Sequence, residues 1–258
     1  MSTGISYLDE TWNITTGCTP ISEGCQNCWA CRMSKRLAGN ANVKHRDRYD
    51  NFKPTFWPER LEEPLKWKRP RVIGVSFMGD LFHERMLYKD IEQIWDVMFD
   101  CPQHTFIILT KRPEQMKDFY RWMKNTMHGR LDDENIWIGV SVENQLRADE
   151  HIPILLQIPA GHHFISIEPM LGTVNIKKAS GVTFWDDPSA GIQWVINGCE
   201  SGPGARPTEI DWTRSVRDQC VEAGIPFYLK QMRVNGRVHE MPLLDGTCWN
   251  QKPKFNQG

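Results

Sequence analysis

The sequence predicts an α/β protein: a single barrel of alternating strands and helices, complete or partial, with a cysteine-rich loop near its N-terminus. Short apolar runs alternate with amphipathic patterns of helical period, which is the order of a parallel sheet with crossover helices. The length of 258 residues is near the upper limit for one hydrophobic core. Six or seven strand units over this length favour a TIM-like β/α barrel. An open doubly wound sheet would leave a similar pattern and is the alternative.

The predicted strands are runs of β-branched and aromatic residues that end in polar side chains. Near-continuous apolar runs are typical of strands that are buried on both faces of a parallel sheet. A run at 9–15 is a candidate first strand. The other runs span residues 71–80, 104–114, 135–144, 162–172, 192–202 and 225–232.

Three helices are predicted between these strands. The first spans 87–101, where four apolar residues have the i, i+3, i+4, i+7 spacing of one helix face: Ile91, Ile94, Trp95 and Met98. The second spans 112–125 and has a proline near its first turn, where a missing N–H is tolerated. The third spans 211–224, with Asp211 expected to cap its start and Gly224 to follow its end.

The chain shows no signal for a domain boundary, so residues 1–258 are expected to form one domain. Residues 39–70 are expected to be irregular, and residues 173–191 to be a loop insertion beside a strand end. Residues 234–258 are expected to be a polar tail rich in turn formers.

Composition and charge limit the function classes. A net charge of −1 argues against a general polyanion binder. No apolar run is long enough to span a bilayer, and the first residues lack the pattern of a secretory signal, so the cytoplasm is the expected location. Thiols are kept reduced there, so the eight cysteines are interpreted as metal ligands, catalytic thiols or, at Cys101 and Cys220, packing residues.

Polar or ionisable residues end nearly every predicted strand. In a β/α barrel the reactive groups lie at the carboxyl ends of the strands, where these residues would meet. A single residue at such a position is as often a cap for the next helix as a functional group. The whole set nevertheless predicts one shared polar pocket. It comprises Ser76, Met78, Gly79, Asp80, Thr110, Lys111, Ser141, Glu143, Asn144, Glu168, Asn197, Cys199, Glu200, Lys230 and Gln231.

Four cysteines follow the first predicted strand. Cys18, Cys25 and Cys28 form C-x6-C-x2-C, and Cys31 adds another C-x2 step. One interpretation is a structural zinc site that uses all four thiolates in a closed tetrahedron. The other is iron–sulfur ligation by three thiolates, with Cys31 left out on the following helix and one iron open to an exogenous ligand. The spacing predicts a metal site and leaves the choice of metal open.

Six blocks of sequence between about residues 10 and 232 carry a resemblance to a known family. They are TWNITTGCTPISEGCQNCWA, SFMGDLFHE, LTKRPEQM, GVSVENQ, SIEPMLG and a last block that begins GCESGPGARP and ends GIPFYLKQM. In this order they resemble a family of phage-encoded proteins related to the radical S-adenosylmethionine superfamily.

The resemblance implies a β/α barrel whose cysteine loop carries a [4Fe–4S] cluster on Cys18, Cys25 and Cys28. S-adenosylmethionine would chelate the remaining iron. An electron from a carrier such as flavodoxin or ferredoxin would then cleave it reductively to a 5′-deoxyadenosyl radical. The usual loop of the superfamily is C-x3-C-x2-C with an aromatic residue before the last cysteine. Here the first gap is six residues, and Trp29 follows Cys28.

The resemblance also implies roles for the strand ends. The motif after the second strand would accept the amino group of S-adenosylmethionine: Met78, Gly79 and Asp80. Polar groups after the fourth strand would hold its ribose: Ser141, Glu143 and Asn144. For Asp80 and Glu143, capping of a helix N-terminus is the alternative.

The substrate is expected among the ionisable groups at the remaining strand ends: Lys111, Arg112, Glu168, Cys199, Glu200 and Lys230. The Cys199 thiol is interpreted either as a hydrogen-atom donor to a substrate radical or as a small apolar packing residue. His83 is interpreted as a proton relay or a helix cap. The glycine-rich turn 201–206 could hold a phosphate or carboxylate through its N–H groups.

Two basic segments beside tryptophan and tyrosine, 44–48 and 66–71, suit nucleic acid. Together with the resemblance to phage-encoded proteins, they point to a nucleobase in DNA or a nucleotide as substrate, for modification, rearrangement or repair. A free small metabolite is the alternative substrate. A hypothesis of another class is a zinc-stabilised module that binds nucleic acid or protein without catalysis.

Overall fold

The computed structural model describes residues 4–126, 134–181 and 191–255. Eight strands form one sheet in the order β1-β4-β5-β6-β7-β8-β9-β10. Every neighbouring pair from β1 to β9 is parallel, and β10 runs antiparallel to β9. The strands are β1 (Glu10–Trp12), β4 (Val72–Val75), β5 (Thr105–Thr110), β6 (Ile136–Ser141), β7 (His162–Ile167), β8 (Ile192–Gly198), β9 (Phe227–Val234) and β10 (Arg237–Glu240).

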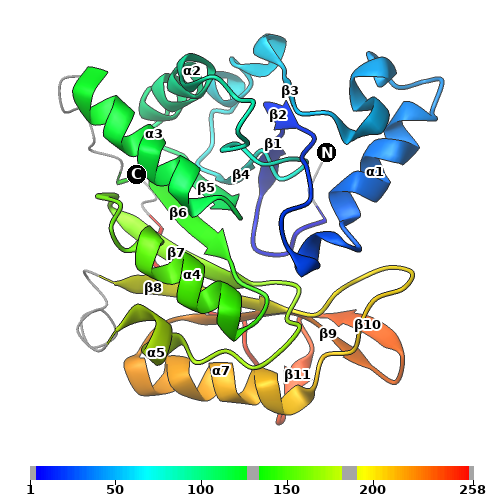
Figure 1. Cartoon of the computed structure of the whole chain (residues 1–258), viewed down its shortest axis with the longest axis vertical. Helices are drawn as coiled ribbons and strands as arrows, with labels where there is room; N and C mark the ends of the chain where they lie inside the picture. The colour runs from blue at the N-terminus through cyan, green and yellow to red at the C-terminus, as the bar shows by residue number, and fades with distance from the viewer. Residues whose placement is uncertain (1–3, 127–133, 182–190, 256–258) are drawn as a thin grey trace.

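The sheet is curled into part of a barrel, with helices against its outer face (Figure 1). All seven predicted strands are present, so the α/β class and the parallel sheet are confirmed. Within the described residues, β1 pairs only with β4 and β10 only with β9. The architecture is therefore a partial β/α barrel with two free edges.

The three predicted helices are present, and their apolar faces are buried against the sheet. In α2 the four residues of the predicted face are all buried. Gly224 follows α7 in the left-handed region with a φ of 68°, which confirms its predicted place. None of the described helices is long and apolar enough to cross a membrane. The helices are α1 (Trp29–Ala38), α2 (Tyr88–Phe99), α3 (Pro113–Thr126), α4 (Gln145–Leu155), α5 (Ile176–Ser180) and α7 (Ile210–Ala223).

The start of α7 differs from the prediction. Its N-cap residue is Glu209, which makes no side-chain capping bond, and Asp211 lies inside the first turn. The Asp211 carboxylate accepts a hydrogen bond from Arg214 Nη1 at 2.8 Å instead of capping the helix. The prediction that Asp211 caps the helix is therefore wrong.

Helix α4 was not predicted, because Pro153 interrupts its pattern and its apolar periodicity is weak. Its start is nevertheless well defined. The Asn144 side chain accepts a hydrogen bond from Arg147 N at 3.1 Å, so Asn144 is the N-cap of α4.

The segment 39–70 is irregular, as predicted, and consists mainly of short 3₁₀ turns. Its one strand, β3, pairs antiparallel with β2 beside the cysteines. The predicted loop insertion at 173–191 contains the short helix α5, and its residues 182–190 lie outside the described part of the chain. The additional elements are β2 (Thr15–Thr16), η1 (Glu23–Cys25), η2 (Arg46–Phe52), β3 (Thr55–Phe56), η3 (Pro58–Arg60) and η4 (Pro64–Lys66).

The tail after Val234 is more ordered than a run of turns. It forms β10 and then a hairpin of β11 (Leu243–Leu244) and β12 (Thr247–Cys248). Asp245 in this hairpin accepts bonds from Arg214 and Arg217 of α7 at 2.6 and 2.7 Å. Among the described residues, β10 pairs only with residues 231–234 of β9, and Leu229 N in the earlier part of β9 bonds the carbonyl of Trp249 at 2.7 Å, so the tail covers the part of β9 that β10 leaves unpaired.

Side chains alternate between two faces of the curled sheet. Residues that point outward pack beneath the helices, where the predicted packing residues Cys101 and Cys220 are fully buried. Residues that point inward form an aromatic layer of Trp137, Phe164, Trp194 and Tyr228. Tyr7 completes this layer, because the centroid of its ring lies 5.5 Å from that of Trp194 and 5.6 Å from that of Tyr228. We name these five rings the aromatic floor; a cavity lies beside it, towards the carboxyl ends of the strands.

Gly139 in β6 makes room for the aromatic floor. A Cβ atom at this position would lie 2.5 Å from Cε1 of Phe164. We expect Gly139→Ala to destabilise the protein by about 1–3 kcal/mol through overpacking. In a Phe164→Leu background the same substitution should lower the free energy of unfolding, measured with urea, by clearly less. If Gly139→Ala lowers the free energy of unfolding equally in both backgrounds, the contact with Phe164 does not limit the packing.

Candidate functional site

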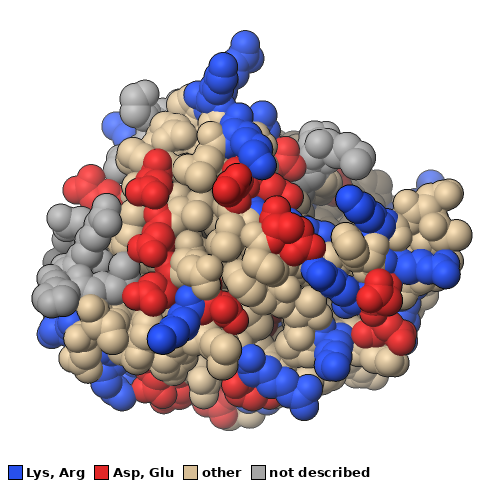
Figure 2. Space-filling view, turned by 90° about the horizontal axis from the view of Figure 1, so that it is seen from above, with Lys and Arg blue, Asp and Glu red and all other residues tan. Residues whose placement is uncertain are grey.

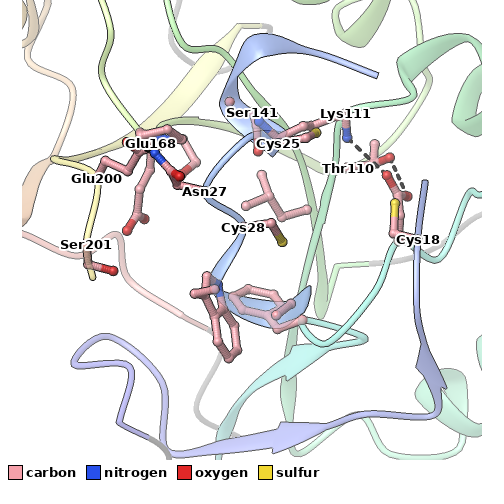
Figure 3. A pocket seen from close by; sticks show the side chains of 18 of the residues that line it. Cys18, Cys25, Asn27, Cys28, Thr110, Lys111, Ser141, Glu168, Glu200 and Ser201 are labelled. Carbon is pink, nitrogen blue, oxygen red and sulfur yellow. Dashed lines mark hydrogen bonds between the residues drawn. The ribbon is translucent and has the colours of Figure 1, made fainter. Parts of the chain in front are cut away.

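A cavity of about 200 Å³ opens at the carboxyl ends of the strands (Figure 3). Its roof is the cysteine loop, residues 17–28, and one wall is apolar, formed by Ile5, Phe52, Phe77 and Leu109. Many of the residues singled out from the sequence meet here. They are Cys18, Cys25, Cys28, Gly79, Asp80, Thr110, Lys111, Arg112, Ser141, Glu168, Cys199, Glu200, Lys230 and Gln231.

The cysteine loop supplies three thiols to this cavity. Cys18, Cys25 and Cys28 all line it, whereas Cys31, in the first turn of α1, is not among its lining residues. Figure 3 shows the three side chains around the same space. Across the described residues, no group of three His, Cys, Asp or Glu side chains has the spacing needed to hold a single metal ion.

The start of the loop is fixed by backbone contacts that require glycine. Gly17 has a φ of 82°, and a Cβ there would overlap the carbonyl group of Lys53. Gly17 N bonds the carbonyl of Met78 at 2.9 Å, and a Cβ on Gly79 would lie 2.7 Å from Gly17 O. Met78 therefore holds the loop through its backbone, and its side chain is not among those that line the cavity.

Arg112 anchors the loop beside the first thiol. Its guanidinium group donates to Cys18 Sγ at 3.2 Å, to the carbonyl of Thr19 at 3.0 Å and to Asp80 Oδ2 at 3.0 Å. Thr19 Oγ1 also lies 2.9 Å from Nε2 of His83. Burial, followed by the charge of Asp80, raises the pKa of Cys18 to about 12, and Arg112 opposes this shift.

Asp80 is engaged by the protein through both carboxylate oxygens. Oδ1 accepts from Thr110 Oγ1 at 2.7 Å and from Phe82 N at 3.0 Å, and Oδ2 accepts from Arg112. The carboxylate lines the cavity and at the same time ties the end of β4 to the end of β5. The alternative interpretation of Asp80 as a helix cap is wrong, because none of the described helices begins directly after it: Phe82 N lies in a turn, and α2 starts only at Tyr88.

Glu143 lies behind the loop. Its side chain is fully buried, pairs with Lys111 Nζ and accepts from Ser22 Oγ at 2.5 Å. A Cβ on Gly24 would overlap this carboxylate, so the loop can approach it only with glycine at that position. Glu143 Oε2 is buried and has no hydrogen-bond partner.

Asn144 also holds the loop from outside the cavity. Besides capping α4, its side chain donates to Glu23 Oε1, and Arg147 Nη2 lies 3.0 Å from Glu23 Oε2. Of the three residues that were expected to hold a ribose, only Ser141 lines the cavity. The other two, Glu143 and Asn144, fasten the loop to the start of α4.

Polar groups from β7 and β9 face the opposite side of the cavity. Glu168 Oε1 and Lys230 Nζ form an ion pair at 2.5 Å. Ser166 is paired in register with Ser141, lines the cavity and has a buried hydroxyl group without a hydrogen-bond partner. The Cys199 thiol also lines the cavity, and burial raises its pKa to about 11.

The glycine-rich turn 201–206 makes hydrogen bonds and an ion pair with neighbouring residues of the chain. Arg206 Nη2 pairs with Glu200 Oε1 at 2.5 Å, and Asn27 Nδ2 donates to Glu200 Oε2 at 2.8 Å. Arg32 Nη2 donates to the carbonyl of Ser201 at 2.8 Å. Burial would raise the pKa of Glu200, but the hydrogen bonds from Arg206 and Asn27 outweigh it and lower the pKa to about 2.

Several residues of this site were missed in the sequence. They are the polar residues between the cysteines, which anchor the loop, and the apolar side chains of the wall. The available signal was the polar composition of the loop, TPISEGCQN, which has more hydrogen-bonding groups than a simple connection needs. The residues concerned are Thr19, Ser22, Glu23, Asn27, Ile5, Phe52 and Phe77.

One family model matches the chain over residues 2–253, and it is described as a protein of unknown function (DUF5131). The chain belongs to this family. No curated protein and no solved structure matches the chain. The DUF5131 match covers the whole sheet and the cysteine loop, so both are features of a member of this family.

Because the pKa of Glu200 is low, the free energy of unfolding should depend on pH in a way that can be measured. Its folded pKa of about 2 lies below the ordinary value of ~4.3, so ionised Glu200 stabilises the fold at neutral pH by on the order of 2 kcal/mol. We expect Glu200→Gln to be less stable than the wild type at neutral pH. The difference should shrink as the pH falls from ~5 towards ~2, where the wild-type carboxylate becomes protonated.

Urea unfolding of both proteins across this pH range measures the difference. Glu114→Gln is a matched control, because that side chain is exposed and pairs weakly with Lys117 at 3.8 Å. The control should follow the wild type at every pH. A difference between Glu200→Gln and wild type that stays constant with pH would contradict the role given to the carboxylate.

Proposed function

We propose that this protein is an enzyme of the radical S-adenosylmethionine type, with a [4Fe–4S] cluster on Cys18, Cys25 and Cys28. The observation that carries the proposal is that one loop brings three thiols to a cavity at the carboxyl ends of parallel strands. In β/α barrels this end of the sheet is where active sites form. The sequence resemblance supports the same choice of cofactor.

The donor set suits a cluster. Each cysteine would bind a different iron, so the three sulfur atoms need to surround a volume and not to converge on one point. Cys18, Cys25 and Cys28 line such a volume, and Cys31 is left out of it. The guanidinium group of Arg112, 3.2 Å from Cys18 Sγ, would stabilise negative charge on that sulfur.

Of the residues expected to bind S-adenosylmethionine, Gly79, Asp80 and Ser141 line the cavity and remain in the proposal. The unpartnered hydroxyl group of Ser166 beside Ser141 adds a hydrogen-bonding group that a polar ligand would satisfy. Met78, Glu143 and Asn144 contribute by holding the cysteine loop in place.

When bound, the cluster and S-adenosylmethionine would supply a 5′-deoxyadenosyl radical, at the cost of one electron from an external carrier. The residues of the chain would shelter this chemistry and orient the substrate. The Glu168–Lys230 pair offers a charged contact, and the buried Cys199 thiol faces the same space as a candidate hydrogen-atom donor. Lys111 is paired with Glu143, and Glu200 is paired with Arg206. In the proposal, Lys111 and Glu200 therefore maintain the shape of the site and do not contact the substrate.

The proposed substrate is a nucleobase in DNA or a nucleotide. Apolar side chains such as Phe52 and Phe77 and polar groups such as Ser141 and Glu168 line the same cavity. A base presents a flat apolar face together with hydrogen-bonding edges, and such a mixed lining suits it. A free small metabolite is the alternative substrate.

Anaerobic reconstitution with iron and sulfide tests the cluster. We expect wild type and Cys31→Ala to become brown with about four iron atoms per chain, and Cys25→Ala to lose most of the colour and iron. Cys248→Ala, in the exposed hairpin, controls for the loss of any thiol. A colourless protein that holds one zinc ion through all four loop cysteines would establish the non-catalytic zinc module instead.

The chemistry is tested on the reconstituted wild type. Reduction with dithionite in the presence of S-adenosylmethionine should release 5′-deoxyadenosine and methionine, measured by chromatography and mass spectrometry. The Cys25→Ala protein should release neither product above background. Intact S-adenosylmethionine after reduction of a protein with a full cluster would refute the proposed function.

A further inference from the structure

The cysteine loop is flanked by a compact basic corner formed by α1 and η2. The two elements are bound together, because Ser34 Oγ donates to the carbonyl of Tyr49 at 2.7 Å. Cys18 N bonds the carbonyl of Phe52 at 3.0 Å, so the corner also adjoins the cavity. We define the basic corner by its exposed cations: Lys35, Arg36, Lys44, Arg46 and Lys53.

The charge of this corner is not balanced by the protein. Residues 32–53 contain seven Lys and Arg but only two Asp and Glu, in a chain with a net charge of −1. Among the described residues, the ion pairs of this segment are limited to Arg48 with Glu59. Figure 2 shows Lys and Arg side chains, with a few Asp and Glu among them, on the right of the molecule, the side on which α1 and the segment after it lie in Figure 1.

The arginines of the outer helices behave differently. Arg147, Arg214 and Arg217 each contact a carboxylate at 3.0 Å or less. Among the described residues, the five exposed cations of the basic corner make no such contact with a carboxylate, and an anionic partner would neutralise them.

Aromatic side chains sort into two groups around this corner. Of the aromatic residues beside the two predicted basic segments, Tyr49 is buried and Trp67 is partly buried, with Arg71 over its ring at 5.5 Å. Trp29, at the start of α1, is 42% exposed and lines the cavity. It thus provides an apolar ring between the basic corner and the cavity mouth.

We propose that the basic corner binds the phosphates of single-stranded nucleic acid and that one unstacked base rests on Trp29 at the cavity mouth. The inference gives the proposed function a partner and a route to the site. The cavity lies beneath the cysteine loop at the strand ends, so a base must leave its stack before it can enter. Cations along a backbone track with an aromatic ring for a base are the usual means of holding single strands.

The exposed ring distinguishes this partner from an acidic protein. A protein electron carrier would also be attracted to the basic corner, but it has no need of an aromatic ring that faces the cavity. A nucleotide uses both features, since its phosphate meets a cation while its base stacks.

Fluorescence anisotropy with a labelled single-stranded oligodeoxynucleotide of mixed sequence tests the proposal without a cluster. We expect Arg36→Glu/Lys44→Glu to weaken binding about ten-fold or more at low salt and to flatten the dependence of affinity on salt. Lys89→Glu/Lys124→Glu is the matched control, with the same charge change on the exposed faces of α2 and α3. The control should bind as the wild type does.

Trp29 is tested separately. Trp29→Ala should weaken single-strand binding on the order of ten-fold, and Trp29→Phe should restore most of it. The same oligonucleotide annealed to its complement should bind wild type more weakly than the single strand does.

Three results would overturn the proposal. They are equal affinity of the basic-corner variant and its control, tighter binding of the duplex, or binding of an acidic electron-carrier protein that depends on the basic corner while the single strand does not bind. Release of 5′-deoxyadenosine is measured independently of the oligonucleotide. A protein that cleaves S-adenosylmethionine but does not bind single strands refutes this inference alone. A protein that binds single strands but assembles no cluster on reconstitution, or does not cleave S-adenosylmethionine, refutes only the proposed function.

Discussion

The cavity depends on the attachment of the cysteine loop to the rim of the sheet. Apart from η1, the loop has no regular structure of its own, so side chains from distant parts of the chain must hold it. Arg112 binds its start, Glu143 its middle and Glu200 its end. These partners are charged and largely buried, and removing one member of such a pair leaves an uncompensated charge that destabilises the fold.

This attachment divides the polar strand ends into two groups. Ser141, Ser166 and Glu168 face the cavity, and Ser166 has a hydroxyl group that the protein leaves without a partner. Glu143 and Asn144 turn towards the loop. The same edge of the sheet therefore both builds the roof and lines the space beneath it, so a substitution at a strand end can alter the site without touching a ligand.

Much of the fold follows from local patterns, because strands buried on both faces leave continuous apolar runs. The hairpin of β11 and β12 leaves no such run, since each of its strands has only two residues, and Asp245 holds it against α7. The strand ends could be assigned to one pocket because a parallel sheet brings them to one edge. The direction of each side chain could not be assigned. Ser22 and Asn27 bond partners 121 and 173 residues away, and no local signal records such contacts.

The aromatic floor has a consequence for the order in which ligands enter and leave the cavity. With Tyr7 packed against Trp194 and Tyr228, the aromatic floor fills the inside of the described barrel below the cavity, towards the amino ends of the strands. Two molecules that enter from the carboxyl ends of the strands would then lie one above the other, with the aromatic floor beneath the inner one. The inner one would have to arrive first and leave last, so two ligands of this cavity would bind in a compulsory order.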